Sequence, residues 1–258
     1  MIEINNISKS YNLSRQQRKE MGADFRGCTV LAVDDISFSC KPGRIFGLIG
    51  PNGAGKTTTL RMIGTMLKPS SGTILVNGFD TVQSPQSVKH NLGFLSGNTG
   101  LYDRLTAEEM VKYYADLHDM SDSDYIESRN RLFSLLDMEE FSGRRIGKLS
   151  TGMMQKVNIA RTMIHQPKVV VFDEPTSGLD VMASRSIIRL IRECKSLGNT
   201  VIFSSHRLGE IKSLCDDLAI IHKGKLFFNG TYEGFESQKQ TDTLEDEFIR
   251  LVGEGAHV

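Results

Sequence analysis

A short glycine-rich segment, residues 50–57, most restricts what this chain can fold into. Its sequence, G-P-N-G-A-G-K-T, fits the pattern G-x-x-x-x-G-K-[ST]. An apolar run of strand length over 44–49 precedes it, and residues 57–67 after it are typical of a helix that stops at 68–72. A strand, a glycine-rich loop and a helix in this order distinguish a phosphate-binding loop from an accidental turn.

The chemistry of this loop predicts a bound nucleoside triphosphate. Glycines leave room for backbone N–H groups to turn toward phosphate oxygens, and a helix N-terminus adds a favourable dipole and unpaired donors. We expect Lys56 to reach the β- and γ-phosphates and the Thr57 hydroxyl to hold Mg²⁺. The predicted nucleotide-binding residues of the loop are Gly50, Pro51, Asn52, Gly53, Ala54, Gly55, Lys56, Thr57 and Thr58.

The composition argues against several other classes. Lys plus Arg and Asp plus Glu are equal at 31 each, so no net field attracts nucleic acid, and we expect no nucleic-acid partner. The cysteines are scattered without a C-x-x-C pair, which favours idle thiols over a zinc or redox site. The N-terminus lacks a secretion signal, and no run approaches the roughly 18 apolar residues that span a bilayer. We therefore expect a soluble, cytoplasmic chain.

Strand-like and helical segments alternate around the loop, which favours a mainly parallel α/β core. Beyond the loop, the patterns predict a helix at about 181–197, a hairpin at 218–229, and strands at 2–7, 33–40, 72–79, 92–95, 168–172 and 200–203. Apolar residues recur at helical spacing over 93–165, which predicts a mostly helical insertion. The polar segment 12–29 predicts an exposed loop.

Two carboxylates follow the apolar run 169–172. One of them, Asp173, can hold Mg²⁺ beside Thr57, and the next, Glu174, can orient and deprotonate an attacking water. Ahead of them, Leu149-Ser150-Thr151-Gly152-Met153 opens an apparent helix. Taken alone, this segment is typical of a helix N-cap, although its hydroxyl and backbone N–H groups can also face a phosphate.

In this order the motifs resemble those of the ATP-binding cassette (ABC) ATPases, over nearly the whole chain. The resemblance also takes in Tyr11, the S-G-L-D string at 177–180, and His206 in S-S-H. It implies an α/β P-loop NTPase fold, the ABC cassette, with a RecA-like, mainly parallel sheet core, an antiparallel β subdomain and a helical subdomain. Residues 1–258 would be a single ABC ATPase domain, divided into a nucleotide-binding core with the β subdomain (1–92 and 166–231), a helical subdomain (93–165) and a C-terminal tail (232–258).

The resemblance also implies residue roles. Two copies are expected to pair head to tail, each ATP lying between the phosphate loop of one copy and Ser150, Thr151, Gly152 and Met153 of the other. Tyr11 would stack on adenine, Glu174 would be the general base, and His206 would touch the γ-phosphate. Asp180 would lie at the dimer interface and link the two sites.

Two departures from the family pattern stand out. Gly97 occupies the position where the family has Gln or Glu, with Asn98 beside it, and Thr151 and Met153 depart from the commoner Leu-Ser-Gly-Gly-Gln. We expect ATP hydrolysis to be slow or more dependent on a partner. We also expect it to be retained, because the chain keeps Lys56, Asp173, Glu174 and His206.

Finer resemblances suggest a transport role. Residues 46–59, 99–106 and 244–251 resemble the ATPase subunits of ABC-2 type exporters, and residues 93–106 and 12–29 are most similar to the sodium-extrusion subfamily. This implies a multi-spanning permease docking near 97–106, a position on the inner face of the cell membrane, and export of sodium or another small substrate. Two alternatives are a soluble ABC ATPase acting on ribosomes or DNA, and a regulatory cassette that binds ATP without hydrolysing it. Each motif occurs once and no long heptad pattern persists, which disfavours the first; Gly97, Thr151 and Met153 are the only support for the second.

Overall fold

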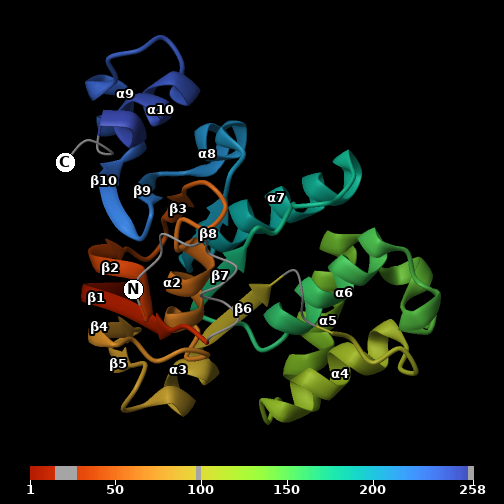
Figure 1. Cartoon of the computed structure of the whole chain (residues 1–258). Coiled ribbons are helices and arrows are strands. Elements are labelled where there is room, and N and C mark those ends of the chain that lie inside the picture. The colour runs from red at the N-terminus through yellow and green to blue at the C-terminus, as the bar shows by residue number, and fades with distance from the viewer. Residues whose placement is uncertain (15–27, 97–99, 255–258) are drawn as a thin grey trace.

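A six-stranded sheet forms the centre of the chain, in a computed structural model that describes residues 1–14, 28–96 and 100–254 (Figure 1). Its strand order is β10-β9-β3-β8-β7-β6, and all neighbours pair in parallel except β9 and β10, which form an antiparallel hairpin. The strands are β3 (Ile45–Ile49), β6 (Leu92–Ser96), β7 (Val169–Asp173), β8 (Thr200–Ser205), β9 (Asp217–His222) and β10 (Lys225–Thr231).

A second sheet is antiparallel, with the order β2-β1-β4-β5. Its strands are β1 (Ile2–Asn12), β2 (Thr29–Cys40), β4 (Ser71–Val76) and β5 (Phe79–Asp80). β2 starts earlier than the predicted residue 33, because β1 pairs with it as far as Asn12 opposite Thr29. The predicted loop 12–29 thus begins and ends inside strands, and its residues 15–27 lie outside the described part of the chain.

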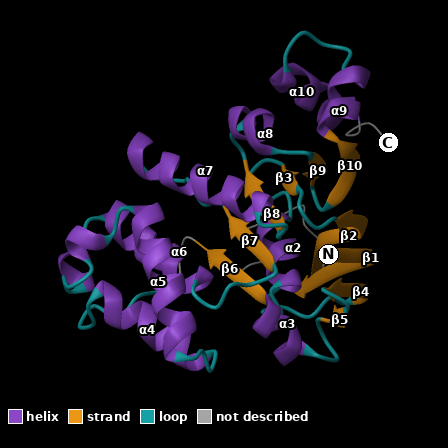
Figure 2. Cartoon of the chain, turned by 180° about the vertical axis from the view of Figure 1, so that it is seen from behind, coloured by secondary structure: helices purple, strands orange, loops and turns teal. Residues whose placement is uncertain are grey.

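The helices divide into groups that the two views separate clearly (Figures 1 and 2). α4, α5 and α6 lie together beyond β6, on the side away from the antiparallel sheet, while α9 and α10 lie beside β10. The helices are α2 (Lys56–Ile63), α3 (Pro85–Asn91), α4 (Ala107–Leu117), α5 (Asp122–Leu136), α6 (Thr151–Met163), α7 (Val181–Ser196), α8 (Leu208–Leu214), α9 (Tyr232–Gln238) and α10 (Leu244–Glu254). Among the described residues, none of these helices is long and apolar enough to cross a membrane.

The central strands β3, β7 and β8 are buried on both faces, which explains their largely apolar sequences. Along β3, Phe46 and Leu48 join the core between the two sheets, where α2 also packs. Ile45 and Ile49 join the core on the opposite face, which contains residues of α6 and α7. The predicted α/β arrangement, with a mainly parallel sheet, an antiparallel sheet and helices, is confirmed.

One predicted helix is shorter than expected. α2 ends at Ile63 rather than near residue 67, because Gly64 follows as the C-cap and Thr65 adopts a left-handed conformation at φ 61°. A Cβ on Gly64 would lie 2.7 Å from the Phe94 ring, so glycine permits the close approach of α2 to β6. Gly64 therefore both ends the helix and lets it pack closely against β6.

Candidate active site

Residues 50–55 connect β3 to α2, and two of the glycines there are required by their surroundings. A Cβ on Gly50 would lie 2.2 Å from the backbone oxygen of Ile221. Gly55 has φ 107°, and a Cβ there would lie 2.6 Å from the backbone oxygen of Ala32. The loop thus packs against neighbouring backbone so closely that only glycine fits at these positions.

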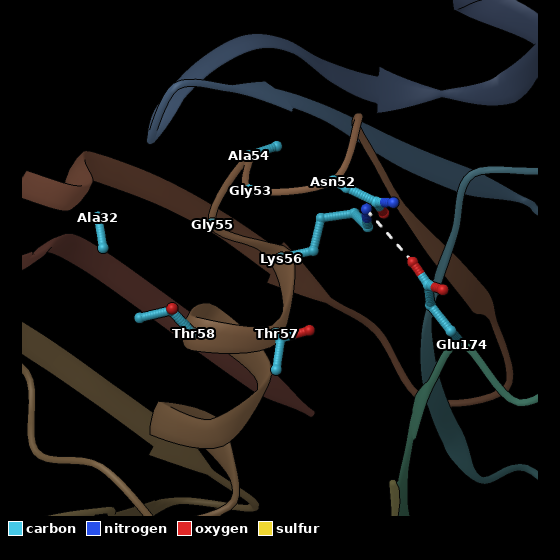
Figure 3. A pocket seen from close by; sticks show the side chains of 9 residues that line it. All are labelled: Ala32, Asn52, Gly53, Ala54, Gly55, Lys56, Thr57, Thr58 and Glu174. Atoms are coloured by element: carbon cyan, nitrogen blue, oxygen red, sulfur yellow. Dashed lines mark ion pairs between the residues drawn. The ribbon is translucent and has the colours of Figure 1, made fainter. Parts of the chain in front are cut away.

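Lys56 lies at the start of α2 and points into the loop rather than into solvent (Figure 3). Its residue is 5% exposed, and its Nζ donates to the backbone oxygens of Gly50 at 2.7 Å and Pro51 at 3.1 Å. The same Nζ lies 3.5 Å from Oε1 of Glu174. The ammonium group is therefore held by carbonyl oxygens and one carboxylate, at the position where a phosphate would be bound.

A cavity of about 150 Å³ lies over this loop (Figure 3). Its lining comes from the loop, from the start of α2, from β2 and from the residue that follows β7. The lining residues are Ala32, Asn52, Gly53, Ala54, Gly55, Lys56, Thr57, Thr58 and Glu174. Seven of the predicted loop residues and the predicted base thus share one cavity, while Gly50 and Pro51 contribute the oxygens that hold Lys56.

Asp173 lies at the end of β7, beside Thr57 of α2. The Thr57 hydroxyl donates to Oδ1 of Asp173 at 3.1 Å. Ser204, opposite Asp173 in β8, donates to the same oxygen at 2.8 Å and accepts from the backbone N–H of Glu174 at 2.9 Å. In the sequence, Ser204 stands out only as part of the S-S-H string. Its position opposite Asp173 in the parallel register identifies it as a partner of that residue.

Glu174 and His206 come together from the ends of adjacent strands. His206 Nδ1 lies 3.3 Å from Oε1 of Glu174, the oxygen that also faces Lys56. Glu174 itself has φ 49°, an uncommon left-handed conformation for a non-glycine residue, which turns the chain sharply after β7. Such strained backbone clusters at functional sites, where the surrounding structure maintains it.

A second cavity of about 360 Å³ adjoins the first on the side of α6. Thr57 and Glu174 line both cavities. The remaining residues of the second cavity are Arg61, Ser96, Thr151, Gln155, Asp173, Ser177 and Leu179. Three of these residues were not predicted as site residues: Arg61, Ser96 and Gln155. They belong to none of the motifs recognised in the sequence, and only the fold brings them to this cavity.

Ser150 and Asp180 both act as helix N-caps. The Ser150 hydroxyl accepts from the backbone N–H of Met153 at 3.3 Å, and Asp180 accepts from that of Ala183 at 2.8 Å. A Cβ on Gly152 would lie 3.7 Å from Oδ2 of Asp180, so the two segments are neighbours. Ser150, Gly152, Met153 and Asp180 line neither cavity, unlike Thr151.

Tyr11 lies in β1 opposite Val30 and is 38% exposed. The ammonium of Lys9 lies 5.4 Å from the centre of its ring. Tyr11 lines neither cavity, so it is not among the residues that the structure brings together around the phosphate loop. The predicted departure at Gly97 and Asn98 lies outside the described residues.

The oxygens of Thr57 and Asp173 suit a magnesium ion. Mg²⁺ prefers hard oxygen ligands and takes only one or two from protein, with phosphates and water completing its octahedron. The two side chains already meet at 3.1 Å, beside the phosphate cavity. Within the described ranges, no group of three or more His, Cys, Asp or Glu residues is arranged to hold a metal.

Fold and site together define a nucleoside triphosphatase of the phosphate-loop class. Residues 33–177 match the family model described as ABC transporter. The chain is 43% identical over 227 residues to the ABC transporter ATP-binding protein NatA of Bacillus subtilis, covering 88% of this chain and 92% of that protein. The chain therefore belongs to the ABC transporter family and is an ATP-binding cassette ATPase.

Solved structures agree with this assignment. A structure described as the ATP-binding subunit of an ABC transporter superimposes with a TM-score of 0.83 at 26% identity, covering 97% of this chain and 99% of that one. A dimeric, post-hydrolysis cassette bound to ADP and Pi superimposes with a TM-score of 0.76 at 22% identity, covering 90% and 98%. The predicted cassette fold is thus confirmed.

Proposed function

We propose that the chain is the ATP-hydrolysing motor of an ABC-2 type exporter and works as a head-to-tail dimer. The observation that carries the proposal is the convergence of Lys56 and His206 on one oxygen of Glu174, at 3.5 and 3.3 Å. A phosphate-binding cation at the start of a helix, with a carboxylate and an imidazole just beyond the ends of two parallel strands, forms the set that hydrolysis of a γ-phosphate requires.

In this proposal the phosphates lie on the backbone N–H groups of residues 50–57, and Tyr11 stacks on adenine. Lys56 leaves the carbonyl oxygens that it now contacts and binds the β- and γ-phosphates. Glu174 orients a water and takes its proton, while His206 contacts the γ-phosphate. Thr57 and Asp173 would hold Mg²⁺, which neutralises phosphate charge when bound.

The second copy supplies what the described cavities lack. Ser150, Gly152 and Met153 lie at the start of α6 and line neither cavity, and Ser150 is exposed. The N-terminus of a helix with free N–H groups is suited to a phosphate, which a partner molecule would present. Asp180, next to Gly152, would then lie at the interface and link the sites. The dimeric solved cassette with the same fold supports this arrangement.

The membrane partner would dock on the helical part near residues 97–106. Tyr102 is 57% exposed and Tyr113 of α4 is 42% exposed, and their rings pack edge to face at 6.0 Å. Exposed aromatic pairs of this kind are enriched at protein interfaces. The ABC-2 type of permease, its sodium or other small cargo, and a place on the cytoplasmic face of the membrane all rest on the sequence resemblance described above.

The test uses the Glu174→Gln variant, which keeps the shape of the side chain and removes its basicity. We expect ATP hydrolysis to fall by about 100-fold or more, because general-base catalysis contributes roughly 10²–10⁴. Light scattering should show an ATP-dependent change from monomer to dimer in this variant. Hydrolysis at the wild-type rate would refute Glu174 as the base, and a permanent monomer with ATP bound would refute dimerisation of the isolated chain.

A further inference from the structure

Glu210 of α8 joins the two chain segments that carry the proposed catalytic groups. Its Oε1 accepts a hydrogen bond from the Thr176 hydroxyl at 2.7 Å, and its Oε2 accepts one from the Ser205 hydroxyl at 2.9 Å. Thr176 lies two residues after Glu174, and Ser205 lies directly before His206. One carboxylate thus bridges the segments that follow β7 and end β8.

The bridge is largely shielded from water. Thr176 is 4% exposed and Ser205 is 3% exposed, and the Glu210 side chain is 13% exposed. Hydrogen bonds to an ionised carboxylate are stronger than those between neutral groups, and burial reduces the screening of their charge. Arg207 adds a longer contact, with its Nη1 3.5 Å from Oε1.

On the side of His206, the bridge holds both flanking residues. The backbone N–H of Arg207 donates to the Ser205 hydroxyl at 3.0 Å, and that hydroxyl in turn donates to Glu210. The backbone on either side of His206 is therefore tied to one carboxylate. The imidazole itself faces the base, with its Nδ1 3.3 Å from Oε1 of Glu174.

On the side of Glu174, the bridge fixes the turn that aims the base. The backbone N–H of Ser177 donates to the backbone oxygen of Glu174 at 3.1 Å, which closes a tight turn around Thr176. Glu174 begins this turn in its left-handed conformation. A bond from Thr176 to Glu210 holds the turn against α8, which is itself anchored by the buried residues Ile211 and Leu214.

We propose that Glu210 is a positioning residue that sets the distance between Glu174 and His206. The inference rests on the proposed roles of those two residues and adds a third that does not touch ATP, since Glu210 lines neither cavity of the site. Ser204 provides a separate link, from β8 to Asp173 and the backbone of Glu174. Ser204 reaches only as far as the backbone N–H of Glu174, whereas Glu210 links Thr176, beyond β7, to Ser205, the last residue of β8.

The experiment compares Glu210→Ala, Glu210→Gln and Thr176→Val with Glu174→Gln and the wild-type protein. Val copies the shape of Thr without its hydroxyl. The matched control is Glu193→Gln, which weakens another partly buried charged contact, with Arg131 at 2.6 Å, between α7 and α5. The measurements are kcat, the Kd for a non-hydrolysable ATP analogue, and the melting temperature of each variant.

We expect Glu210→Ala to lower kcat by about tenfold to 100-fold, the range for misplacing a catalytic group by up to an ångström, with the analogue Kd within about twofold. Glu210→Gln, which keeps one acceptor oxygen, should lower kcat by a smaller factor. Glu193→Gln should lower only the melting temperature. Thr176→Val should lower kcat, and adding it to Glu210→Ala should cause little further loss, because both remove the same link.

Three results would overturn the inference: an unchanged kcat in Glu210→Ala, an equal loss of kcat in Glu193→Gln, or multiplying losses in the Thr176 and Glu210 double variant. If Glu210→Ala does not fold, Thr176→Val still tests the inference, because it removes one hydrogen bond of the same link. A wild-type rate in Glu174→Gln would instead refute the proposed base, so the two failures are distinguishable.

Discussion

The two regions proposed to meet ATP differ sharply in how the chain builds them. The phosphate-loop region, defined by Lys56, Thr57, Asp173, Glu174 and His206, is interconnected by hydrogen bonds and ion pairs within one molecule. The signature region, defined as residues 150–153, begins a helix that is capped by the Ser150 hydroxyl, which accepts from the backbone N–H of Met153. One region is assembled within the fold, whereas the other contributes only Thr151 to the lining of the two described cavities.

This difference indicates how such a protein converts binding into motion. In our proposal ATP replaces the internal partners of the phosphate-loop region, whereas the signature region receives its ATP from a second copy. In our proposal ATP gains its full set of contacts only when two copies close, so it shifts the population toward the closed dimer through differential affinity. The predictions below change one region at a time.

The largest expected effect is at the centre of the phosphate-loop region. Lys56→Ala removes the buried ammonium, and hydrogen bonds to charged groups contribute roughly 1.5–3 kcal/mol. We expect ATP affinity to fall by about 100-fold and hydrolysis to reach background, as measured by calorimetry and phosphate release. Lys156→Ala in α6, which contacts Asp137 at 3.8 Å, is the control and should bind ATP normally. An equal loss of ATP affinity in Lys56→Ala and Lys156→Ala would show that ATP binding does not depend specifically on the phosphate-loop region.

The second prediction tests the backbone of the same region. Gly50→Ala places a Cβ 2.2 Å from the Ile221 backbone oxygen, a contact that main chain cannot relieve without moving. We expect the free energy of unfolding to fall by about 2–3 kcal/mol, as overpacking typically costs, with loss of ATP binding. Gly143→Ala is the control, because a Cβ there meets nothing within 4 Å. Denaturant unfolding of both variants measures the difference, and an undiminished stability of Gly50→Ala would contradict the packing argument.

The third prediction concerns the helices that carry the signature region. His165, just after α6, stacks on His118, which follows α4, with ring centres 3.7 Å apart. Burial is the main cause that lowers the pKa of His165 to about 3, and the nearby His118 is the second cause. Burial also lowers the pKa of His118. His90 of α3 faces the pair and disfavours its protonation, while Asp119 favours protonation of His118.

Because the folded pKa of His165 lies below its unfolded value, the unfolded chain binds the proton more readily. Stability is therefore fully present above about pH 6.5 and is lost as the pH falls toward 3. At pH 5 we expect a loss of about 2 kcal/mol, from 1.5 pH units at 1.36 kcal/mol each. Hydrogen exchange should quicken in α4 and α6 before α2. His165→Phe keeps the stacked ring, and acid sensitivity that persists undiminished in it would exclude His165 as the cause.

The smallest change in stability tests the signature region itself. Ser150→Ala removes an N-cap, which costs about 1 kcal/mol. Ser121→Ala is a close match, because Ser121 caps α5 by accepting from the backbone N–H of Asp124 at 3.1 Å. We expect similar melting temperatures for the two variants, but ATP-dependent dimers only with Ser121→Ala. The dimers are counted by light scattering in a Glu174→Gln background. Dimers from both would show that the Ser150 hydroxyl is not needed at the interface.

Local sequence predicted the central elements well where both faces of a strand are buried. β3, β7 and β8 are continuous apolar runs, and each was predicted to within a few residues of its observed bounds. The ends of elements were predicted less well. α2 stops early because of Gly64 and its contact with Phe94, and β2 extends because β1 continues beside it. Pairing between distant segments has no local signal.

The same division holds in the site. Motif spacing identified Lys56, Thr57, Asp173 and Glu174, with His206 added by the family resemblance, and the structure brings these residues together. It gave no indication of Ser204 or Glu210 as partners, because their contacts with Asp173 and Thr176 span 31 and 34 residues. Such contacts arise from strand register and from the position of α8, and neither follows from periodicity.

The sequence by itself determined the class of chemistry, since a loop such as 50–57 needs glycines and a lysine at fixed spacing to hold phosphate. It also determined the alternation of strands and helices, because burial on one or both faces imposes a period. Only the tertiary structure decided which oxygens and hydroxyls surround Glu174, and that Ser150, Gly152 and Met153 line neither cavity of the site. These depend on parallel strands that align distant residues at one sheet edge, an arrangement that many separate contacts fix together.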